Sequence, residues 1–309
     1  MKSLRPQFAE TISRIGGVDK DVFVIVGDIS HGLLSEFRAN YPERYRNIGI
    51  CEPAMISMSA GLNAVGFNPV IHTIAPFLIE RSFEQIKLDF GYQKLDCNLV
   101  SVGSSFDYAK LGCSHHSYID VALISSIEGS QVFVPGSSEE FDRLFISNYQ
   151  KPGIKYFRLT ESGHGFDQLT QNAVGGKNII VRPGSDLTIV ALGPALHTAM
   201  AVAEMLILEG IETEVIYVNS FKPFDSHAII ESVKKTSRLV SISQLSSSGG
   251  LGQLCLEAVS GKVLFGYLNF EINTFIRGYG EMGDLIERAH LSPRQVRETI
   301  LKTLWGFES

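Results

Sequence analysis

Short β-branched runs alternate with helix-length amphipathic stretches along most of the chain, and this alternation constrains the fold more than any other feature. Such a pattern is typical of strand-helix-strand crossovers that build a mostly parallel sheet. It occurs twice, with a stretch rich in Gly, Asn and Gln at residues 163–184 between the two series. We therefore predict an α/β protein of two domains, residues 1–170 and 185–309, each a mostly parallel sheet flanked by helices.

The two series define the expected elements. The first predicts strands at residues 22–26, 69–73, 98–102, 131–134 and 155–158, and helices at 53–65, 77–90, 119–127 and 138–148. The second predicts strands at 187–192, 214–218, 239–243 and 271–276, and helices at 195–209, 226–235 and 251–259. A last helix is expected to begin at Ser292-Pro293, where an N-cap residue precedes a proline at the first helical position.

Composition and charge exclude several classes of partner. The 309 residues carry a formal charge of -6 and no cluster of lysine and arginine that follows a phosphate backbone, so nucleic acid is not an expected partner. The apolar runs are far shorter than the roughly 20 residues that span a bilayer, so no membrane segment is expected. The N-terminus shows no apolar signal region, and we expect a cytoplasmic protein.

The cysteines and the glycine-rich run both favour structural roles. Cys51, Cys97, Cys113 and Cys255 form no C-x-x-C pair and have no histidine at metal-ligand spacing, so we expect no metal site on this chain. All four are expected to be small buried hydrophobic residues in a reducing compartment. The run at residues 246–252 matches neither G-x-G-x-x-G nor a P-loop, and we expect a structural turn or interface element there.

One acidic residue lies at the start of an unusual helix. Glu52 and Pro53 precede a stretch rich in small residues, which permits another backbone to approach closely. A carboxylate is favoured at the positive N-terminal end of a helix, and proline fits the first turn. Taken alone, Glu52 is explained as a capping carboxylate.

The surrounding motifs resemble those of the transketolase family, in the domain that binds the pyrimidine ring of thiamine diphosphate. Gly49-Ile50-Cys51-Glu52 and its small-residue helix match the first motif of that domain. Residues 73–77 and 81–85 resemble its aromatic segment, and residues 112–116 stand in place of its Gly-x-Thr-His loop. In the second half, residues 184–193, 222–225 and 249–252 resemble the C-terminal domain of the same family, in the same order.

The resemblance implies a role for each of four residues. Glu52 would activate the cofactor through a hydrogen bond to its aminopyrimidine ring, which then removes the proton from the thiazolium carbon. Phe77 would stack on the pyrimidine with Ile74 beside it, although a core position also explains Phe77. His115 would contact substrate near the reacting carbon, although a surface pair with His116 is an equal alternative.

Asp28 follows the first predicted strand, at the edge where α/β sheets place functional groups. It would face the substrate or the partner described below. An Asx turn explains the residue equally well.

The family's diphosphate site is missing from the chain. Members of the family hold Mg²⁺ and the diphosphate with a Gly-Asp-Gly motif and a downstream Asn, and no Gly-Asp-Gly occurs in this sequence. The resemblance therefore implies a split enzyme of carbohydrate metabolism, in which a separate N-terminal-half subunit carries the diphosphate and Mg²⁺ site. We expect a heterotetramer with two chains of each kind, α2β2.

The substrate positions depart from the family pattern. Gly103 stands in place of a histidine, Leu111 in place of an acid and Glu161 in place of a phosphate-binding arginine. Replacing a cation by an anion disfavours the usual binding of a sugar phosphate. The candidate substrates that remain are a modified, nucleotide-linked or unphosphorylated sugar, or a 2-oxo acid. Two alternatives stay open, namely the beta subunit of a 2-oxo acid dehydrogenase or acetoin-cleaving complex, and a catalytically silent regulatory subunit.

Overall fold

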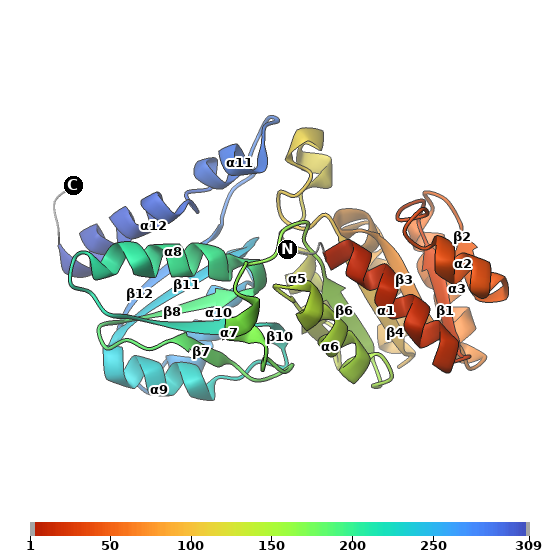
Figure 1. Cartoon of the computed structure of the whole chain (residues 1–309), viewed down its shortest axis with the longest axis horizontal. Helices are drawn as coiled ribbons and strands as arrows, with labels where there is room; N and C mark the ends of the chain where they lie inside the picture. The colour runs from red at the N-terminus through yellow and green to blue at the C-terminus, as the bar shows by residue number, and fades with distance from the viewer. Residues whose placement is uncertain (1–3, 307–309) are drawn as a thin grey trace.

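Two mostly parallel sheets, each covered by helices, lie side by side along the long axis of the molecule (Figure 1). The structure is a computed structural model that describes residues 4–306. The order of strands is β10-β5-β6-β4-β3-β1-β2 in the first sheet and β12-β11-β8-β9-β7 in the second. Among these strands only β10 and β7 run antiparallel to their neighbours, so the predicted fold class is confirmed.

The strands of the first sheet are β1 (Val22–Val26), β2 (Tyr45–Asn47), β3 (Asn68–Ile74), β4 (Cys97–Val102), β5 (Gln131–Phe133), β6 (Ile154–Arg158) and β10 (Ser220–Lys222). Those of the second are β7 (Ile179–Arg182), β8 (Leu187–Leu192), β9 (Thr213–Val218), β11 (Arg238–Ser246) and β12 (Gly266–Ile272). Strands β1, β4, β6, β8 and β9 are buried along their whole lengths, as expected where helices cover both faces of a parallel sheet.

The helices of the first half of the chain are α1 (Leu4–Val18), α2 (Ser35–Asn40), α3 (Glu52–Ala64), α4 (Phe83–Gln85), α5 (Asp120–Ser125), α6 (Ser138–Asn148) and α7 (Asp167–Thr170). Those of the second half are α8 (Leu196–Ile207), α9 (His227–Thr236), α10 (Leu251–Val259), α11 (Met282–Arg288) and α12 (Pro293–Ile300). Single π-helical turns lie at Pro76–Glu80, Ile86–Tyr92 and Leu301–Trp305, and short 3-10 helices at Pro42–Arg44, Ala109–Leu111, Cys113–His115 and Gly193–Ala195.

Helices α1 and α6 cover one face of the first sheet together (Figure 1). Phe8 of α1 and Phe141 of α6 meet edge to face, with ring centroids 6.2 Å apart. Both side chains are completely buried. Helix α3 contributes Met55 and Ile56 to the core on the other face, so its N-terminal turn is held against the sheet.

The two halves of the chain share hydrogen bonds as well as apolar contacts. Strand β10, which comes from the second half of the sequence, pairs with β5 at the edge of the first sheet. Glu140 of α6 is completely buried and accepts hydrogen bonds from the Tyr217 hydroxyl and, at 2.7 Å, from the Asn219 amide. Burial raises the pKa of Glu140, and these donors act against that rise.

Most predicted elements are confirmed, and the departures have physical reasons. The helix expected at 77–90 is interrupted, because α4 is flanked by two π-helical turns. The strand expected at 271–276 is wrong. Strand β12 lies earlier because its pairing with β11 begins at Gly266 and ends at Ile272. Helix α1 and strands β2, β7 and β10 were not predicted.

The expectation that all four cysteines are buried is wrong for two of them. Cys97 and Cys255 are buried, but Cys51 and Cys113 are exposed, because Cys51 precedes α3 and Cys113 begins a short 3-10 helix in the connection after β4. The glycine-rich run is the structural element that was expected. The Glu271 carboxylate accepts hydrogen bonds from the backbone N–H groups of Leu251 and Gly252, at 2.7 and 3.4 Å, and so occupies the N-terminus of α10.

Candidate functional site

The residues singled out in the sequence follow the carboxyl ends of strands in the first sheet. Asp28 follows β1, Glu52 follows β2, Phe77 follows β3, His115 follows β4 and Glu161 follows β6. In a parallel sheet these ends lie at one edge, where open α/β folds bind ligands. The fold therefore places these five positions at one edge of the first sheet.

Glu52 is a buried carboxylate that the helix does not use as a cap. It is the first residue of α3, and Cys51 occupies the N-cap position without a side-chain hydrogen bond. The side chain of Glu52 is 2% exposed, and its Oε2 accepts a hydrogen bond of 2.8 Å from Nη1 of Arg81. Oε1 makes no hydrogen bond to any of the described residues. Oε1 is therefore available to accept a hydrogen bond from another group.

Arg81 connects Glu52 to the ring of Phe77. Its guanidinium carbon lies 4.1 Å from the centroid of that ring, within the range of a cation-π contact. The ring of His115 meets Phe77 edge to face, with centroids 5.0 Å apart. Glu52, Arg81, Phe77 and His115 thus form a continuous line of contacts. Arg81 belongs to the aromatic segment noted in the sequence, but its link to the other three residues was not predicted.

The two adjacent histidines have different surroundings. His115 is half-buried, and Ser114 Oγ lies 3.0 Å from its Nδ1. Burial and the charge of Arg81 lower the pKa of His115. His116 is 4% exposed, packs against Phe106 at 5.1 Å, and neither of its ring nitrogens has a hydrogen-bond partner among the described residues. Of the two, His115 contacts Phe77.

The loop that carries His115 is anchored in the second half of the chain. Phe106 and Ala109 are buried in the hydrophobic core built around the second sheet. The ring of Tyr279 lies against Gly112, where a Cβ atom would be 2.6 Å from Tyr279 Cε1. In Figure 1 this yellow loop lies beside the blue segment that leads into α11. The second half therefore helps to position His115.

Tyr108 is a site residue that was not predicted from the sequence. Its ring lies so close to Gly103 that a Cβ atom there would be 2.0 Å from Tyr108 Cε2. The same ring is 6.3 Å from that of His115. Burial raises the pKa of Tyr108, and the Glu161 carboxylate raises it further through its charge and a hydrogen bond. Tyr108 therefore fills the space that a larger side chain at position 103 would need.

A buried ion pair between Arg158 and Asp120 lies next to the loop that carries His115. Arg158, at the end of β6, donates from Nε to Asp120 Oδ2 at 2.8 Å and from Nη2 to the Ser117 carbonyl at 2.8 Å. Both charged side chains are almost completely buried. Partial burial and the charge of Asp120 raise the pKa of nearby Glu80 to about 7, and Ser117 Oγ donates to that carboxyl at 3.4 Å.

Asp28 and Ile74 lie at the same edge without joining the line of contacts. Asp28 is exposed, has a positive φ of 53°, and its Oδ1 accepts a hydrogen bond of 3.1 Å from Asn47. Asn47 Oδ1 in turn accepts from the N–H groups of Asp28 and Gly49, so these residues shape the turn before Glu52. Ile74 is half-buried at the end of β3, opposite Val102.

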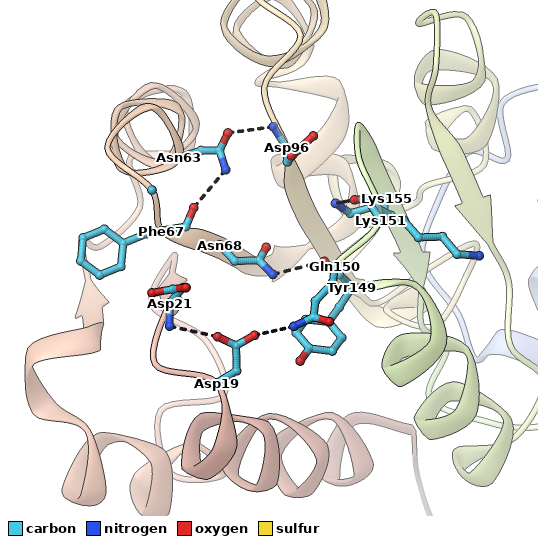
Figure 2. A pocket seen from close by; sticks show the side chains of 11 residues that line it. Asp19, Asp21, Asn63, Phe67, Asn68, Asp96, Tyr149, Gln150, Lys151 and Lys155 are labelled. Atoms are coloured by element: carbon cyan, nitrogen blue, oxygen red, sulfur yellow. Dashed lines mark hydrogen bonds between the residues drawn. The ribbon is translucent and has the colours of Figure 1, made fainter.

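Figure 2 shows a polar hollow at the opposite edge of the first sheet. It is lined by residues that precede or begin strands, such as Asp21, Asn68 and Asp96. Two of its polar groups have partners within the protein, since Asp96 Oδ1 accepts from the N–H of Gly153 at 2.6 Å and Asn68 donates to the Tyr149 carbonyl at 3.2 Å. Because its lining lies at the amino ends of the strands, the hollow is separate from the candidate site.

Neither a metal centre nor a membrane span is found within residues 4–306. In this part of the chain, no group of three or more His, Cys, Asp or Glu side chains is arranged to hold a metal ion. No helix in this range is long and apolar enough to cross a membrane.

Comparison with known proteins gives consistent matches along the chain. Residues 1–164 match the family described as "Transketolase, pyrimidine binding domain", and residues 176–288 match "Transketolase, C-terminal domain". An apulose-4-phosphate transketolase subunit of Phocaeicola vulgatus is 28% identical, with 84% of each chain covered. The "6-deoxy-6-sulfo-D-fructose transketolase subunit SqwH" of Clostridium sp. (strain MSTE9) is 30% identical, over 82% of this chain and 77% of that protein.

Among solved structures, one titled "Split gene transketolase, inactive beta4 tetramer" superimposes with a TM-score of 0.85. It is 28% identical in sequence, and the match covers 98% of both chains. The similarity thus extends through both sheets and the segment between them.

Proposed function

The chain belongs to the transketolase family, and from this premise we propose that it is one subunit of a split, thiamine diphosphate-dependent transferase. The reaction proposed is the transfer of a ketol or acyl unit between carbonyl compounds. The observation that carries the proposal is the buried Glu52 carboxyl, which Arg81 links to the Phe77 ring and which has one oxygen without a hydrogen bond among the described residues. Residues 1–170 and 185–309 remain the proposed domains.

The residues at the edge of the first sheet fit an aminopyrimidine ring. Glu52 Oε1 would hydrogen-bond to the ring nitrogen and hold or release a proton there, on a side chain that is only 2% exposed. Phe77 would stack on the ring and Ile74 would pack beside it. When bound, thiamine diphosphate supplies a nucleophilic carbon and stabilises the transferred fragment as a carbanion. His115 would orient the substrate near that carbon.

A partner polypeptide is proposed for the diphosphate and Mg²⁺. Both relatives named above are called subunits of transketolases. Large apolar side chains are exposed on and around α3 in this chain, with Ile50 70%, Met58 46% and Val65 73% exposed. Exposed apolar groups gathered in one region favour burial against another protein. We propose the assembly α2β2, in which the partner completes the cofactor site.

The substrate is proposed to be a sugar that differs from the ordinary sugar phosphates. The names of the two relatives refer to two different sugars, apulose 4-phosphate and 6-deoxy-6-sulfo-D-fructose. In this chain, Glu161 is exposed near Tyr108 and His115 and would repel a phosphate at that point.

Reconstitution tests the proposal directly. The chain is purified with a partner polypeptide of similar size that contains Gly-Asp-Gly, and thiamine diphosphate is titrated with Mg²⁺ while transfer from ketose donors is measured. We expect cofactor binding and turnover with both chains together, and a loss of turnover of at least about 100-fold in Glu52→Gln. Unchanged turnover in that variant would contradict the role of Glu52. Turnover only with a 2-oxo acid and a lipoyl acceptor would identify the dehydrogenase alternative.

A further inference from the structure

The Arg81 guanidinium contacts both Glu52 and Phe77, the two side chains that the proposed function places against the cofactor ring. Nη1 of Arg81 donates to Glu52 Oε2 at 2.8 Å, and its guanidinium carbon lies 4.1 Å from the centroid of the Phe77 ring. Glu52 comes from the first turn of α3, and Phe77 comes from the π-helical turn Pro76–Glu80. Arg81 therefore links side chains from two separate elements. The planar guanidinium suits both contacts, because its edge donates hydrogen bonds and its face stacks on rings.

The arrangement leaves the working oxygen of Glu52 available. Only Oε2 is engaged by Arg81, while Oε1 makes no hydrogen bond within the described part of the chain. The side chain of Arg81 is 42% exposed, whereas that of Glu52 is 2% exposed. A glutamate side chain has several rotatable bonds, and fixing one oxygen fixes the direction of the other.

The charge of Arg81 also reaches His115. Partial burial lowers the pKa of that histidine, and the charge of Arg81 lowers it further. His115 meets the Phe77 ring from another side, with centroids 5.0 Å apart. The same cation therefore favours a neutral His115.

Resting on the proposed function, we infer that Arg81 is a positioning residue, which fixes Glu52 and Phe77 in the arrangement that receives the cofactor ring. It acts through these two side chains. Its removal should slow the activation of the cofactor more than it weakens cofactor binding, because most of the binding is expected from the diphosphate site on the partner.

The test measures a reaction that needs no substrate. Hydrogen-deuterium exchange at C2 of bound thiamine diphosphate is followed by NMR in the reconstituted complex. We expect Arg81→Met to slow the exchange by on the order of 10- to 100-fold, since small displacements in a reacting site cost this much. The dissociation constant of thiamine diphosphate should change by less than about threefold. Arg81→Lys should recover part of the rate, because lysine restores the charge but lacks the planar guanidinium that both hydrogen-bonds to Glu52 and stacks on Phe77.

A matched control comes from the second sheet. The guanidinium carbon of Arg238 lies 4.6 Å from a ring of Trp305, so Arg238→Met removes a comparable cation-π contact far from the site. This control should leave the exchange rate unchanged. Thermal unfolding of each variant confirms that it is folded.

The outcomes separate this inference from the proposed function. Slow exchange in Glu52→Gln together with wild-type exchange in Arg81→Met overturns the role of Arg81 and leaves the proposed function intact. Wild-type exchange in Glu52→Gln overturns the proposed function. Tighter cofactor binding or faster exchange in Arg81→Met would show that the guanidinium occupies the place of the ring, which also overturns the inference.

Discussion

Replacing Arg158 by methionine should destabilise the protein strongly while leaving the rest of the first sheet in place. The substitution removes the Nε hydrogen bond to Asp120 and the Nη2 hydrogen bond to the Ser117 carbonyl, both 2.8 Å long. Asp120 is completely buried, and its Oδ1 already has no partner among the described residues. The variant therefore leaves a buried carboxylate whose remaining side-chain donor is the Tyr156 hydroxyl, at 2.6 Å.

Leaving one member of a buried ion pair without its partner costs about 3 to 5 kcal/mol. We expect a loss of that size in the free energy of unfolding of Arg158→Met, measured by urea denaturation of the full chain. The double variant Asp120→Asn/Arg158→Met should be more stable than Arg158→Met alone, because it removes the uncompensated charge while an amide oxygen still accepts from Tyr156.

The control for this series is Arg14→Met. Arg14 also pairs with an aspartate, Asp142, but half of its side chain is exposed. An exposed pair contributes about 0 to 1 kcal/mol, so this variant should be nearly neutral. If Arg158→Met lost less than about 1 kcal/mol, or if the double variant were the least stable of the three, the reasoning from burial would be refuted.

Three other residues give predictions of their own. Tyr279→Ala should raise the KM for substrate severalfold and leave the dissociation constant of thiamine diphosphate unchanged, because the ring supports Gly112 in the loop that carries His115. Equal effects on the KM and on the dissociation constant would argue against this role of Tyr279. Gly103→Ala should cost about 1 to 3 kcal/mol in urea denaturation, from its positive φ of 71° and the clash with Tyr108, and Tyr108→Ala in the same chain should restore part of the loss. His72 is buried and neutral, with its pKa lowered to about 3. Between about pH 6.5 and 3 the unfolded chain therefore binds one more proton than the folded chain. The free energy of unfolding should fall by up to about 1.4 kcal/mol per pH unit as the pH drops through this range. In His72→Gln that part of the pH dependence should disappear.

Much of the fold could be predicted because the central strands are buried on both faces. β1 appears in the sequence as a continuous apolar run, β4 and β8 appear as mostly apolar runs, and the structure has strands at these positions. The strands that were missed are short or lie at sheet edges, such as β2 and β10, where pairing with a neighbour decides the conformation. β12 was misplaced because its first four residues are only partly buried or exposed and carry no apolar run.

The site was predictable as a set of positions and less so as a set of contacts. Alternating strands and helices place Glu52, Phe77 and His115 after strand ends at one edge, and the roles of these residues stay predictions. The ion pair between Arg81 and Glu52 joins residues 29 positions apart. The pattern of neighbouring residues in the sequence contains no information about such a contact. The same holds for the packing of Tyr108 on Gly103, which depends on how the loop folds back.

The pairing of β10 with β5 determines how this chain can be divided. A fragment that ends before the second half would leave β5 as an open edge, with its N–H and C=O groups unpaired and ready to join another strand. The complementary fragment would carry a short strand without a sheet to complete. We therefore expect each fragment, produced alone, to associate with itself, so that the whole chain is the smallest unit suitable for solution work.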